Sequence, residues 1–212
     1  MSQFPMKSWS DLEQAEAEYK KNLEMEEKLG RKEGMKEAYG NLGTVYLALA
    51  HLDKAEDMFK KSLEIEKQLA NKEGMASDYG YLGTIYQMQD DLEQAENMFK
   101  KNLEINQGLG SKQGMATVYG KLGEIYYTRR DLDRAEDMFK KSLEIDEILD
   151  NKEKMATAYG YIGDIYRIRF DLEQAEDMYK KGLKLFEATG SKRMIEIMRE
   201  MLTNLRKKKK QL

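Results

Sequence analysis

Hydrophobic residues follow the period of an α-helix along almost the whole chain, in two kinds of segment. In the first kind, apolar residues fall three or four positions apart from Met35 to Tyr46, so they share one helix face. In the second kind, a similar stripe runs from Leu52 to Leu69. The few residues between the two stripes leave room for a short turn, which predicts an antiparallel helical hairpin.

This pattern recurs with a constant period of 40 residues and without gaps. The frame aligns DLEQAE at Asp11, HLDKAE at His51, DLEQAE at Asp91, DLDRAE at Asp131 and DLEQAE at Asp171, and it aligns AYGNLGTVY at Ala38, DYGYLGTIY at Asp78, VYGKLGEIY at Val118 and AYGYIGDIY at Ala158. A fixed period of this size marks stacked supersecondary units, because one unit cannot bury its apolar face alone. The sequence therefore predicts an all-α repeat protein.

The repeat frame also predicts the domain organisation. Residues 1–190 are expected to form one solenoid, with a half repeat at 11–30 and full repeats at 31–70, 71–110, 111–150 and 151–190. Residues 191–206 carry an amphipathic stripe without the repeat signature, as a capping helix does. Residues 207–212 form a basic tail that is expected to be frayed and solvated.

Two sets of glycines lie inside the predicted first helices, where glycine costs about 1 kcal/mol relative to alanine. One set is Gly43, Gly83, Gly123 and Gly163, and the other is Gly40, Gly80, Gly120 and Gly160. The first set predicts that the helix backbones nearly touch opposite Ala55 and its equivalents, with Phe59 and its equivalents filling the space beyond. The second set predicts a bare backbone stripe beside a groove, or else relief of crowding between neighbouring tyrosines.

The motif Leu42-Gly43-x-x-Tyr46, followed by Ala55 and Phe59, resembles the tetratricopeptide repeat (TPR). The period of 40 exceeds the usual 34 or so, and the proline that closes the second helix of that family is missing. The longer form resembles the repeats of the Leu-Gly-Asn adaptor proteins, kinesin light chains and many bacterial signalling proteins. The resemblance implies a right-handed superhelical α-solenoid of antiparallel helix pairs, about ten helices in all, that acts as a protein–protein interaction scaffold or adaptor.

The same resemblance puts the first helix of each unit on a concave wall, where it would bind a peptide or a partner helix with tyrosines as anchors. The wall residues vary between repeats while the scaffold positions are nearly constant, although an unconstrained surface would vary as well. They are Glu37, Asn41, Thr44 and Leu47; Ser77, Tyr81, Thr84 and Gln87; Thr117, Lys121, Glu124 and Tyr127; Thr157, Tyr161, Asp164 and Arg167.

Composition and charge limit the classes of partner that the chain is expected to bind. The net charge is −3, and without the five positive charges of Arg206 to Lys210 it is −8, which argues against nucleic acid. There is no cysteine, and no apolar run approaches the roughly 20 residues that span a bilayer, so no membrane partner is expected. We expect a cytoplasmic protein.

No constellation of residues predicts catalysis. His51 is the only histidine and is expected to be a turn or helix-cap residue, so no metal pair exists. Carboxylates such as Glu56 and Asp57 precede Lys60 and Lys61 by four residues, as surface ion pairs on helices do. We therefore predict no enzyme activity, no cofactor and no metal.

A second hypothesis concerns self-assembly. The half repeat at 11–30 has no first helix of its own, so the face that holds Tyr19 and Leu23 would be exposed or covered by another copy of the chain. In that case the protein is a structural building block that forms a homo-oligomer.

Overall fold

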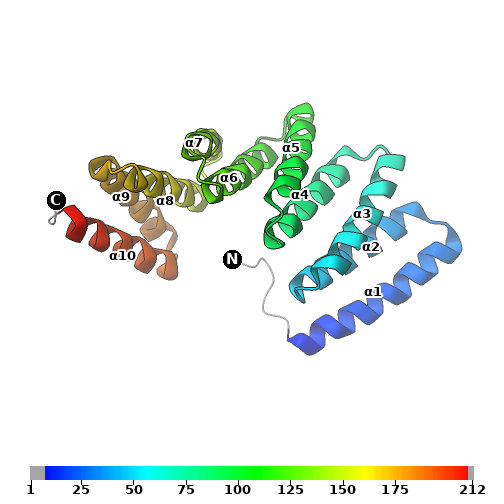
Figure 1. Cartoon of the computed structure of the whole chain (residues 1–212). Coiled ribbons are helices and arrows are strands. Elements are labelled where there is room, and N and C mark those ends of the chain that lie inside the picture. Colours follow the sequence, from blue (N-terminus) through cyan, green and yellow to red (C-terminus); the bar gives the residue numbers. More distant parts are fainter. Residues whose placement is uncertain (1–7, 210–212) are drawn as a thin grey trace. The chain divides into compact units, whose positions relative to one another are not determined.

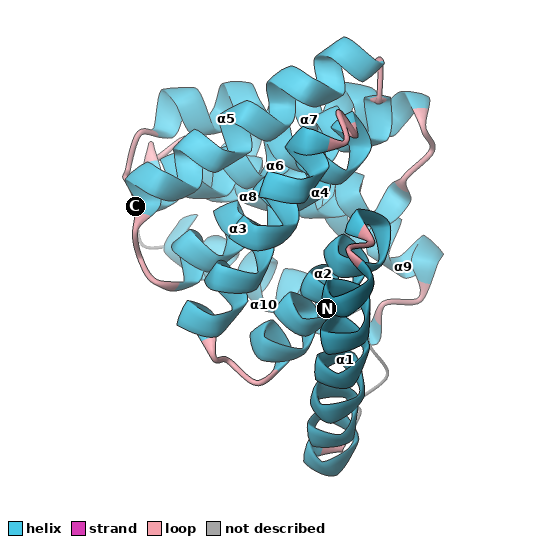
Figure 2. Ribbon diagram, turned by 90° about the vertical axis from the view of Figure 1, so that its right-hand side faces the viewer, coloured by secondary structure: helices cyan, strands magenta, loops and turns pink. Residues whose placement is uncertain are grey.

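The computed structural model describes residues 8–209, and this part of the chain forms ten α-helices joined by short turns (Figure 1). They are α1 (Trp9–Leu29), α2 (Lys32–Ala48), α3 (Leu52–Gln68), α4 (Lys72–Met88), α5 (Leu92–Leu109), α6 (Lys112–Thr128), α7 (Leu132–Ile148), α8 (Lys152–Ile168), α9 (Leu172–Thr189) and α10 (Lys192–Lys209). Figure 2 shows helices and loops and, over these residues, no strand. The prediction of an all-α fold is confirmed.

The helices form two compact units. Unit 1 spans residues 1–109 and contains α1 to α5, and unit 2 spans residues 110–212 and contains α6 to α10. Within unit 1, the most extensive contacts join α2 to α3 and α4 to α5, and within unit 2 they join α6 to α7 and α8 to α9. Each predicted pair of first and second helices therefore packs as a hairpin.

The packing inside each hairpin explains the first set of glycines. A Cβ atom on Gly43 would lie 2.7 Å from the ring of Phe59, which is closer than carbon atoms can approach. The same clash would arise between Gly83 and Phe99, Gly123 and Phe139, and Gly163 and Tyr179, at 2.7–2.8 Å. The aromatic ring, rather than the backbone of the second helix, is thus the group that requires glycine.

A hydrogen bond ties each of the first helices α2, α4 and α8 to the second helix that precedes it. Tyr46 donates its hydroxyl to Glu16 at 2.9 Å, and Tyr86 donates to Glu56 at 2.7 Å. In unit 2, Tyr166 donates to Glu136 at 3.0 Å. The tyrosine of the Leu-Gly-x-x-Tyr motif therefore sets the stacking of successive hairpins as well as filling the core.

The first helix of the chain is less buried than its equivalents. Ala55 and Phe59 of α3 are 0% and 1% exposed, whereas Ala15 and Tyr19 at the same positions of α1 are half-buried. No residue of α1 is buried, although a capping box between Ser8 and Asp11 fixes the start of this helix.

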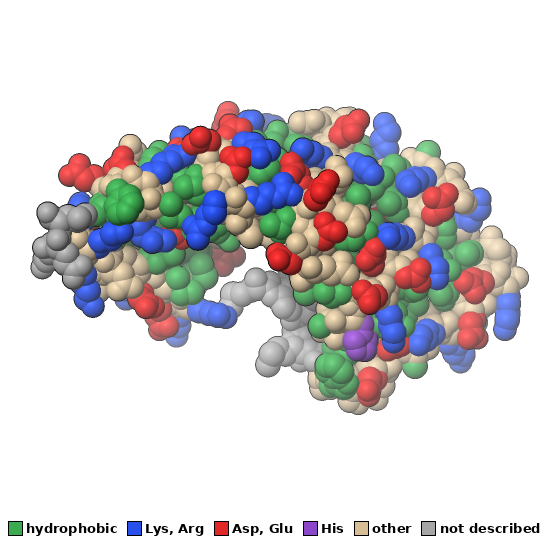
Figure 3. Space-filling model, viewed as in Figure 1, with side chains coloured by type: hydrophobic (Ala, Val, Ile, Leu, Met, Phe, Trp, Pro, Cys, Tyr) green, Lys and Arg blue, Asp and Glu red, His purple; other side chains and the backbone are tan. Residues whose placement is uncertain are grey.

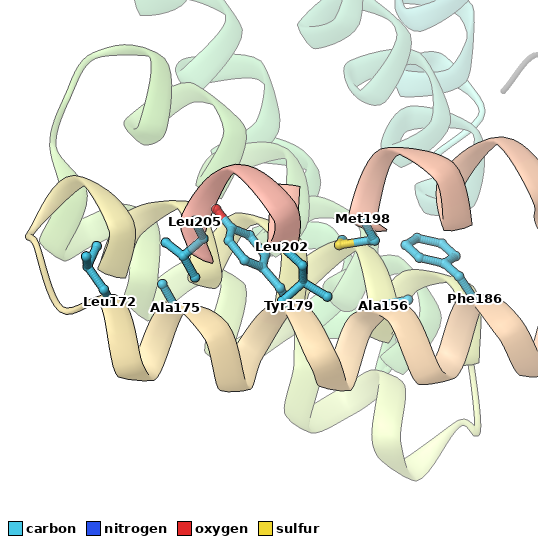
Figure 4. Packing of buried hydrophobic residues seen from close by; sticks show 8 residues of the cluster. All are labelled: Ala156, Leu172, Ala175, Tyr179, Phe186, Met198, Leu202 and Leu205. Atoms are coloured by element: carbon cyan, nitrogen blue, oxygen red, sulfur yellow. The ribbon is translucent and has the colours of Figure 1, made fainter. Parts of the chain in front are cut away.

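The last helix covers the end of unit 2. Its Leu205 and Leu202 lie beside Ala175 and Tyr179 of α9, and its Met198 lies beside Phe186 of the same helix (Figure 4).

This helix continues to Lys209, beyond the expected end at residue 206. Lys209 lies 3.1 Å from Glu176, whose pKa is lowered to about 2 by Lys180 first, then by Lys209 and Arg206. The expectation of a frayed tail is therefore wrong for residues 207–209, while residues 1–7 and 210–212 lie outside the described part.

Candidate functional site

The predicted wall residues all lie on the first helices α2, α4, α6 and α8. In unit 1, several of them line a pocket of about 410 Å³ between α2, α3 and α4, which we call the unit-1 pocket. Its lining residues are Lys36, Glu37, Gly40, Asn41, Thr44, Phe59, Ser62, Glu66, Gly74, Ser77, Asp78 and Tyr81. Five predicted residues, Glu37, Asn41, Thr44, Ser77 and Tyr81, are thus brought together.

A second pocket lies at the equivalent place in unit 2, 80 residues further along the chain. This unit-2 pocket has a volume of about 160 Å³ between α6, α7 and α8. It is lined by Ala116, Thr117, Gly120, Lys121, Glu124, Phe139, Ser142, Lys154, Thr157, Ala158 and Tyr161. The two units therefore build the same kind of depression from the same repeat positions, with different side chains.

Stacked aromatic rings form one side of each pocket. Tyr81 lies parallel to Phe59 with ring centroids 4.4 Å apart, and Tyr161 lies parallel to Phe139 at 4.6 Å. Tyr127 meets Tyr161 edge to face at 5.6 Å, and burial raises the pKa of Tyr161 to about 12. The tyrosines expected to be anchors are half-buried and belong partly to the core, so a ligand can reach only part of each ring.

The other wall residues do not join these pockets. Four of them, Leu47, Thr84, Gln87 and Tyr127, lie outside both linings. Asp164 and Arg167 line a separate pocket of about 230 Å³ with residues of α9 and α10. They form an ion pair at 2.7 Å, and Tyr179 donates its hydroxyl to Asp164 at 2.8 Å. Asp164 and Arg167 therefore have their charge partners within unit 2.

The surface of the chain carries both charge signs. Basic and acidic side chains are interspersed on the face seen in Figure 3. On the wall itself, Lys121 pairs with Glu124 at 2.8 Å along one helix, which is worth a few tenths of a kcal/mol. These two charges of the wall therefore form a local pair rather than free groups that await a ligand.

Only two glycines of the second set lie beside open space. A Cβ atom on Gly40 would meet no atom within 4 Å, and one on Gly120 would meet only Ser142 at 3.7 Å. Gly80 instead faces Asn102 at 2.8 Å, and Gly160 is buried beneath Met198. The expected continuous backbone stripe is therefore reduced to single openings, at Gly40 in the unit-1 pocket and at Gly120 in the unit-2 pocket.

Sequence reasoning missed the charged residues at the back of the pockets. Asp78 stands where the other repeats have Ala38, Val118 and Ala158, and Lys154 stands where glycine occurs in the earlier repeats. These departures from the repeat were the available signal.

The unit-1 pocket contains two buried carboxylates. Asp78 and Glu66 are each 5% exposed, and Oδ2 of Asp78 and Oε2 of Glu66 have no hydrogen-bond partner within the described part of the chain. Lys36 pairs with the other oxygen of Glu66 at 3.2 Å. Burial raises the pKa of Asp78 to about 7 and the charge of Glu66 adds to this, while Ser62 and Lys36 act in the opposite direction.

Stacked helical hairpins with a 40-residue period define an α-helical repeat protein, and the comparisons with known proteins give its family. The tetratricopeptide repeat model matches residues 10–68, 74–148 and 114–188. The chain therefore belongs to the tetratricopeptide repeat family. No curated protein that was compared matches the sequence.

Solved structures share this fold at low sequence identity. BtubC (BKLC) from P. vanneervenii is 19% identical with a TM-score of 0.70, and the match covers 94% of this chain and 92% of that one. RapI in its apo form is 16% identical with a TM-score of 0.80, over 91% of this chain and 54% of that one. A putative kinesin light chain with TPR-like repeats from Podosopora anserina is 12% identical with a TM-score of 0.71, over 86% and 90%.

Family membership points to a protein–protein interaction scaffold, and proteins of this family are generally not enzymes. No helix in residues 8–209 is both long and apolar enough to cross a membrane.

Proposed function

We propose that the chain is an interaction scaffold that binds a peptide or a partner helix along the wall of first helices α2, α4, α6 and α8. The observation that carries this proposal is the duplicated pocket. Five predicted wall residues gather in unit 1 and five in unit 2, each time beside a stacked pair of aromatic rings. Each of the two pockets, built to one plan with different polar linings, suits a side chain of an extended or helical ligand.

The pockets supply the two ingredients of a specific protein interface. Partly buried rings provide apolar contact at little cost in conformational entropy. Exposed polar side chains such as Ser77 and Thr157 stand at the rim, where they can fix the register of a ligand. We infer that the protein works by binding alone, without catalysis or cofactor, and in the cytoplasm.

The test introduces arginine at exposed positions of the wall. Peptides that bind the purified chain would be selected from a displayed library, and their Kd would be measured for the wild type and for the Ser77→Arg/Thr157→Arg variant. Because the new side chains obstruct both pockets without entering the core, we expect the affinity to fall at least about tenfold, the equivalent of 1.4 kcal/mol. Alanine at Tyr81 or Tyr161 would be a poorer test, since it also removes packing from Phe59 or Phe139.

A matched control makes the same charge change on the second helices. Gln68 of α3 and Ala188 of α9 are exposed and lie outside both pockets, so Gln68→Arg/Ala188→Arg should leave Kd within about twofold, a difference below 0.5 kcal/mol. Equal losses in the two variants, or no loss in the wall variant, would reject the wall as the binding surface.

The exposed apolar side chains of α1 favour a second candidate, which is self-association. Trp9, Met25 and Leu29 are 61%, 51% and 52% exposed, although they are large apolar side chains. The partner would be α1 of a second copy rather than α10. Arg199 and Thr203 of α10 occupy the positions that Tyr39 and Gly43 hold in α2, and neither suits a helix packed like α3. Light scattering that gives a monomer mass at all concentrations would remove this candidate.

A further inference from the structure

The unit-1 pocket differs from its counterpart in unit 2 by its charge. Its lining has Glu37, Glu66 and Asp78 against a single cation, Lys36. At the equivalent positions, the unit-2 pocket has Thr117 for Glu37, Ala158 for Asp78 and the cation Lys154 for Gly74. The two pockets are built from equivalent repeat positions. Because their charges differ, we expect them to bind different ligand groups.

Two buried carboxylates share one ammonium group in the unit-1 pocket. Lys36 lies 3.2 Å from Oε1 of Glu66, while Oε2 of Glu66 and Oδ2 of Asp78 have no hydrogen-bond partner among residues 8–209. A buried carboxylate without its own partner is costly, and a second positive charge would remove that cost. Both side chains line the pocket, so a group that enters it can reach them.

The backbone around the carboxylates is open because of two glycines. A Cβ atom on Gly74 would lie 2.2 Å from the carboxylate carbon of Glu66, so glycine is what lets this side chain lie over the start of α4. A Cβ atom on Gly40 would meet nothing within 4 Å, which leaves the side of α2 free. In unit 2 the position of Gly74 is occupied by Lys154, which donates a hydrogen bond to Thr117 at 2.8 Å.

We propose that the unit-1 pocket binds the cationic side chain of a lysine or arginine residue of the partner, between Asp78 and Glu66 and against the ring of Tyr81. This inference rests on the proposed function and adds the chemistry of one anchor residue. The ammonium or guanidinium group would donate hydrogen bonds to the free oxygens of Asp78 and Glu66, and the stem of the side chain would contact the stacked rings of Tyr81 and Phe59.

An organic cation fits the pocket better than a metal ion. Divalent calcium takes six to eight oxygen ligands, and the pocket offers two buried carboxylates with an ammonium group already beside one of them. No group of three or more metal-ligating side chains that could hold a metal occurs within the described residues. A lysine or arginine side chain needs only the carboxylates, with the hydroxyl groups of Ser62 and Ser77 at hand in the lining.

The experiment uses small probes in place of a partner. N-acetyl-argininamide and N-acetyl-lysinamide would be titrated into the full chain, with the uncharged N-acetyl-citrullinamide as control, while backbone amide shifts are followed by NMR. The cationic probes should shift amides of residues 36–41 and 74–81, and the citrulline probe should not. Comparing the two cationic probes decides between arginine and lysine.

Variants assign the binding to the carboxylates. Asp78→Asn keeps the size of the side chain, and Ala158 shows that the position does not need a charge; this variant should weaken binding of the cationic probes about tenfold, as loss of a charge-assisted hydrogen bond would. Glu66→Gln should act in the same direction. Asp146→Asn in unit 2, which changes another buried carboxylate at the position equivalent to Glu66, should leave the affinity unchanged.

The pH dependence gives a second readout. Because a proton on Asp78 competes with the cation, the affinity of the wild type should rise between pH 6 and pH 8, as Asp78 ionises with a pKa of about 7. The charged groups that line the pocket with Asp78 are Glu66 of α3 and Lys36 and Glu37 of α2. The affinity of Asp78→Asn should stay flat.

Equal binding of the citrulline probe, or equal affinity of Asp78→Asn and wild type, would overturn the inference. These outcomes are independent of the library experiment with the wall variants. If the wall variants lose the selected peptides while the cationic probes fail to bind, the scaffold proposal stands and the cation site falls. If the probes bind in unit 1 but the wall variants keep their affinity for the peptides, the cation site stands and the scaffold proposal falls.

Discussion

The Asp78→Asn variant is expected to be more stable than the wild type at pH 8, by a margin that shrinks as the pH is lowered to 4. The pKa of Asp78 rises from its ordinary value of 3.8 to about 7 on folding. The folded chain therefore binds a proton more tightly than the unfolded chain, and stability is lost as the pH rises from about 4 to about 7. The loss amounts to about 2 to 4 kcal/mol above pH 7.

Asparagine cannot ionise, so it removes this loss without changing the shape of the side chain. The difference in unfolding free energy between variant and wild type, measured by urea denaturation at several pH values, isolates Asp78 from the other carboxylates. As a control, Asp57→Asn alters an exposed ion pair with Lys61 and should change stability by less than about 0.5 kcal/mol at every pH. If the difference in unfolding free energy between Asp78→Asn and the wild type does not vary with pH, folding does not raise the pKa of Asp78.

Alanine at two glycines of the same helix is expected to change stability in opposite directions. Gly43→Ala puts a methyl group 2.7 Å from the ring of Phe59, which is itself 1% exposed and stacked on Tyr81, so the ring cannot easily move away. Overpacking of this kind costs about 1 to 3 kcal/mol. Gly40→Ala meets nothing within 4 Å, so the higher helix propensity of alanine should stabilise the chain by about 0.5 to 1 kcal/mol.

Thermal and urea denaturation of both variants would check this pair. A gain in stability for Gly43→Ala would mean that glycine is not required by the ring, and that the recurrence of Gly43, Gly83, Gly123 and Gly163 has another cause. A loss for Gly40→Ala would mean that the space beside α2 is not open.

The fold could be predicted from the sequence because the residues that pack the two helices of a hairpin recur in each repeat. A single Leu-Gly-x-x-Tyr motif would be weak evidence for the fold, but the spacing between Gly43, Ala55 and Phe59 recurs in every full repeat. The one change is Tyr179, which replaces the phenylalanine in the last repeat. Helical periodicity and short turns then leave one way to pair the helices.

The turns were less predictable. The second residue after each first helix has a positive φ angle of 56° to 62°, at Ala50, Asp90, Arg130 and Phe170. Left-handed backbone at residues other than glycine costs roughly 1–2 kcal/mol, so no propensity argument would place them there. Hydrogen bonds between neighbouring residues close each turn and hold this conformation. One example is the bond from the amide of His51 to the carbonyl of Tyr46, at 2.8 Å.

The pockets could be predicted in outline only. The variable positions of the first helices indicated the right helix face, because that inference needs helical geometry alone. It could not show that Tyr81 and Tyr161 stack on Phe59 and Phe139, since those contacts join different repeats. Nor could it bring Asp78 to Glu66 and Lys36, because these residues meet only when two hairpins stack.

Amide hydrogen exchange on a complex with a selected peptide tests the central claim, that the first helices form the binding wall, most directly. If the proposal is right, peptide binding slows exchange on α2, α4, α6 and α8, and it leaves the exposed faces of α3, α5, α7 and α9 unchanged. Protection confined to the second helices or to α1 would contradict it.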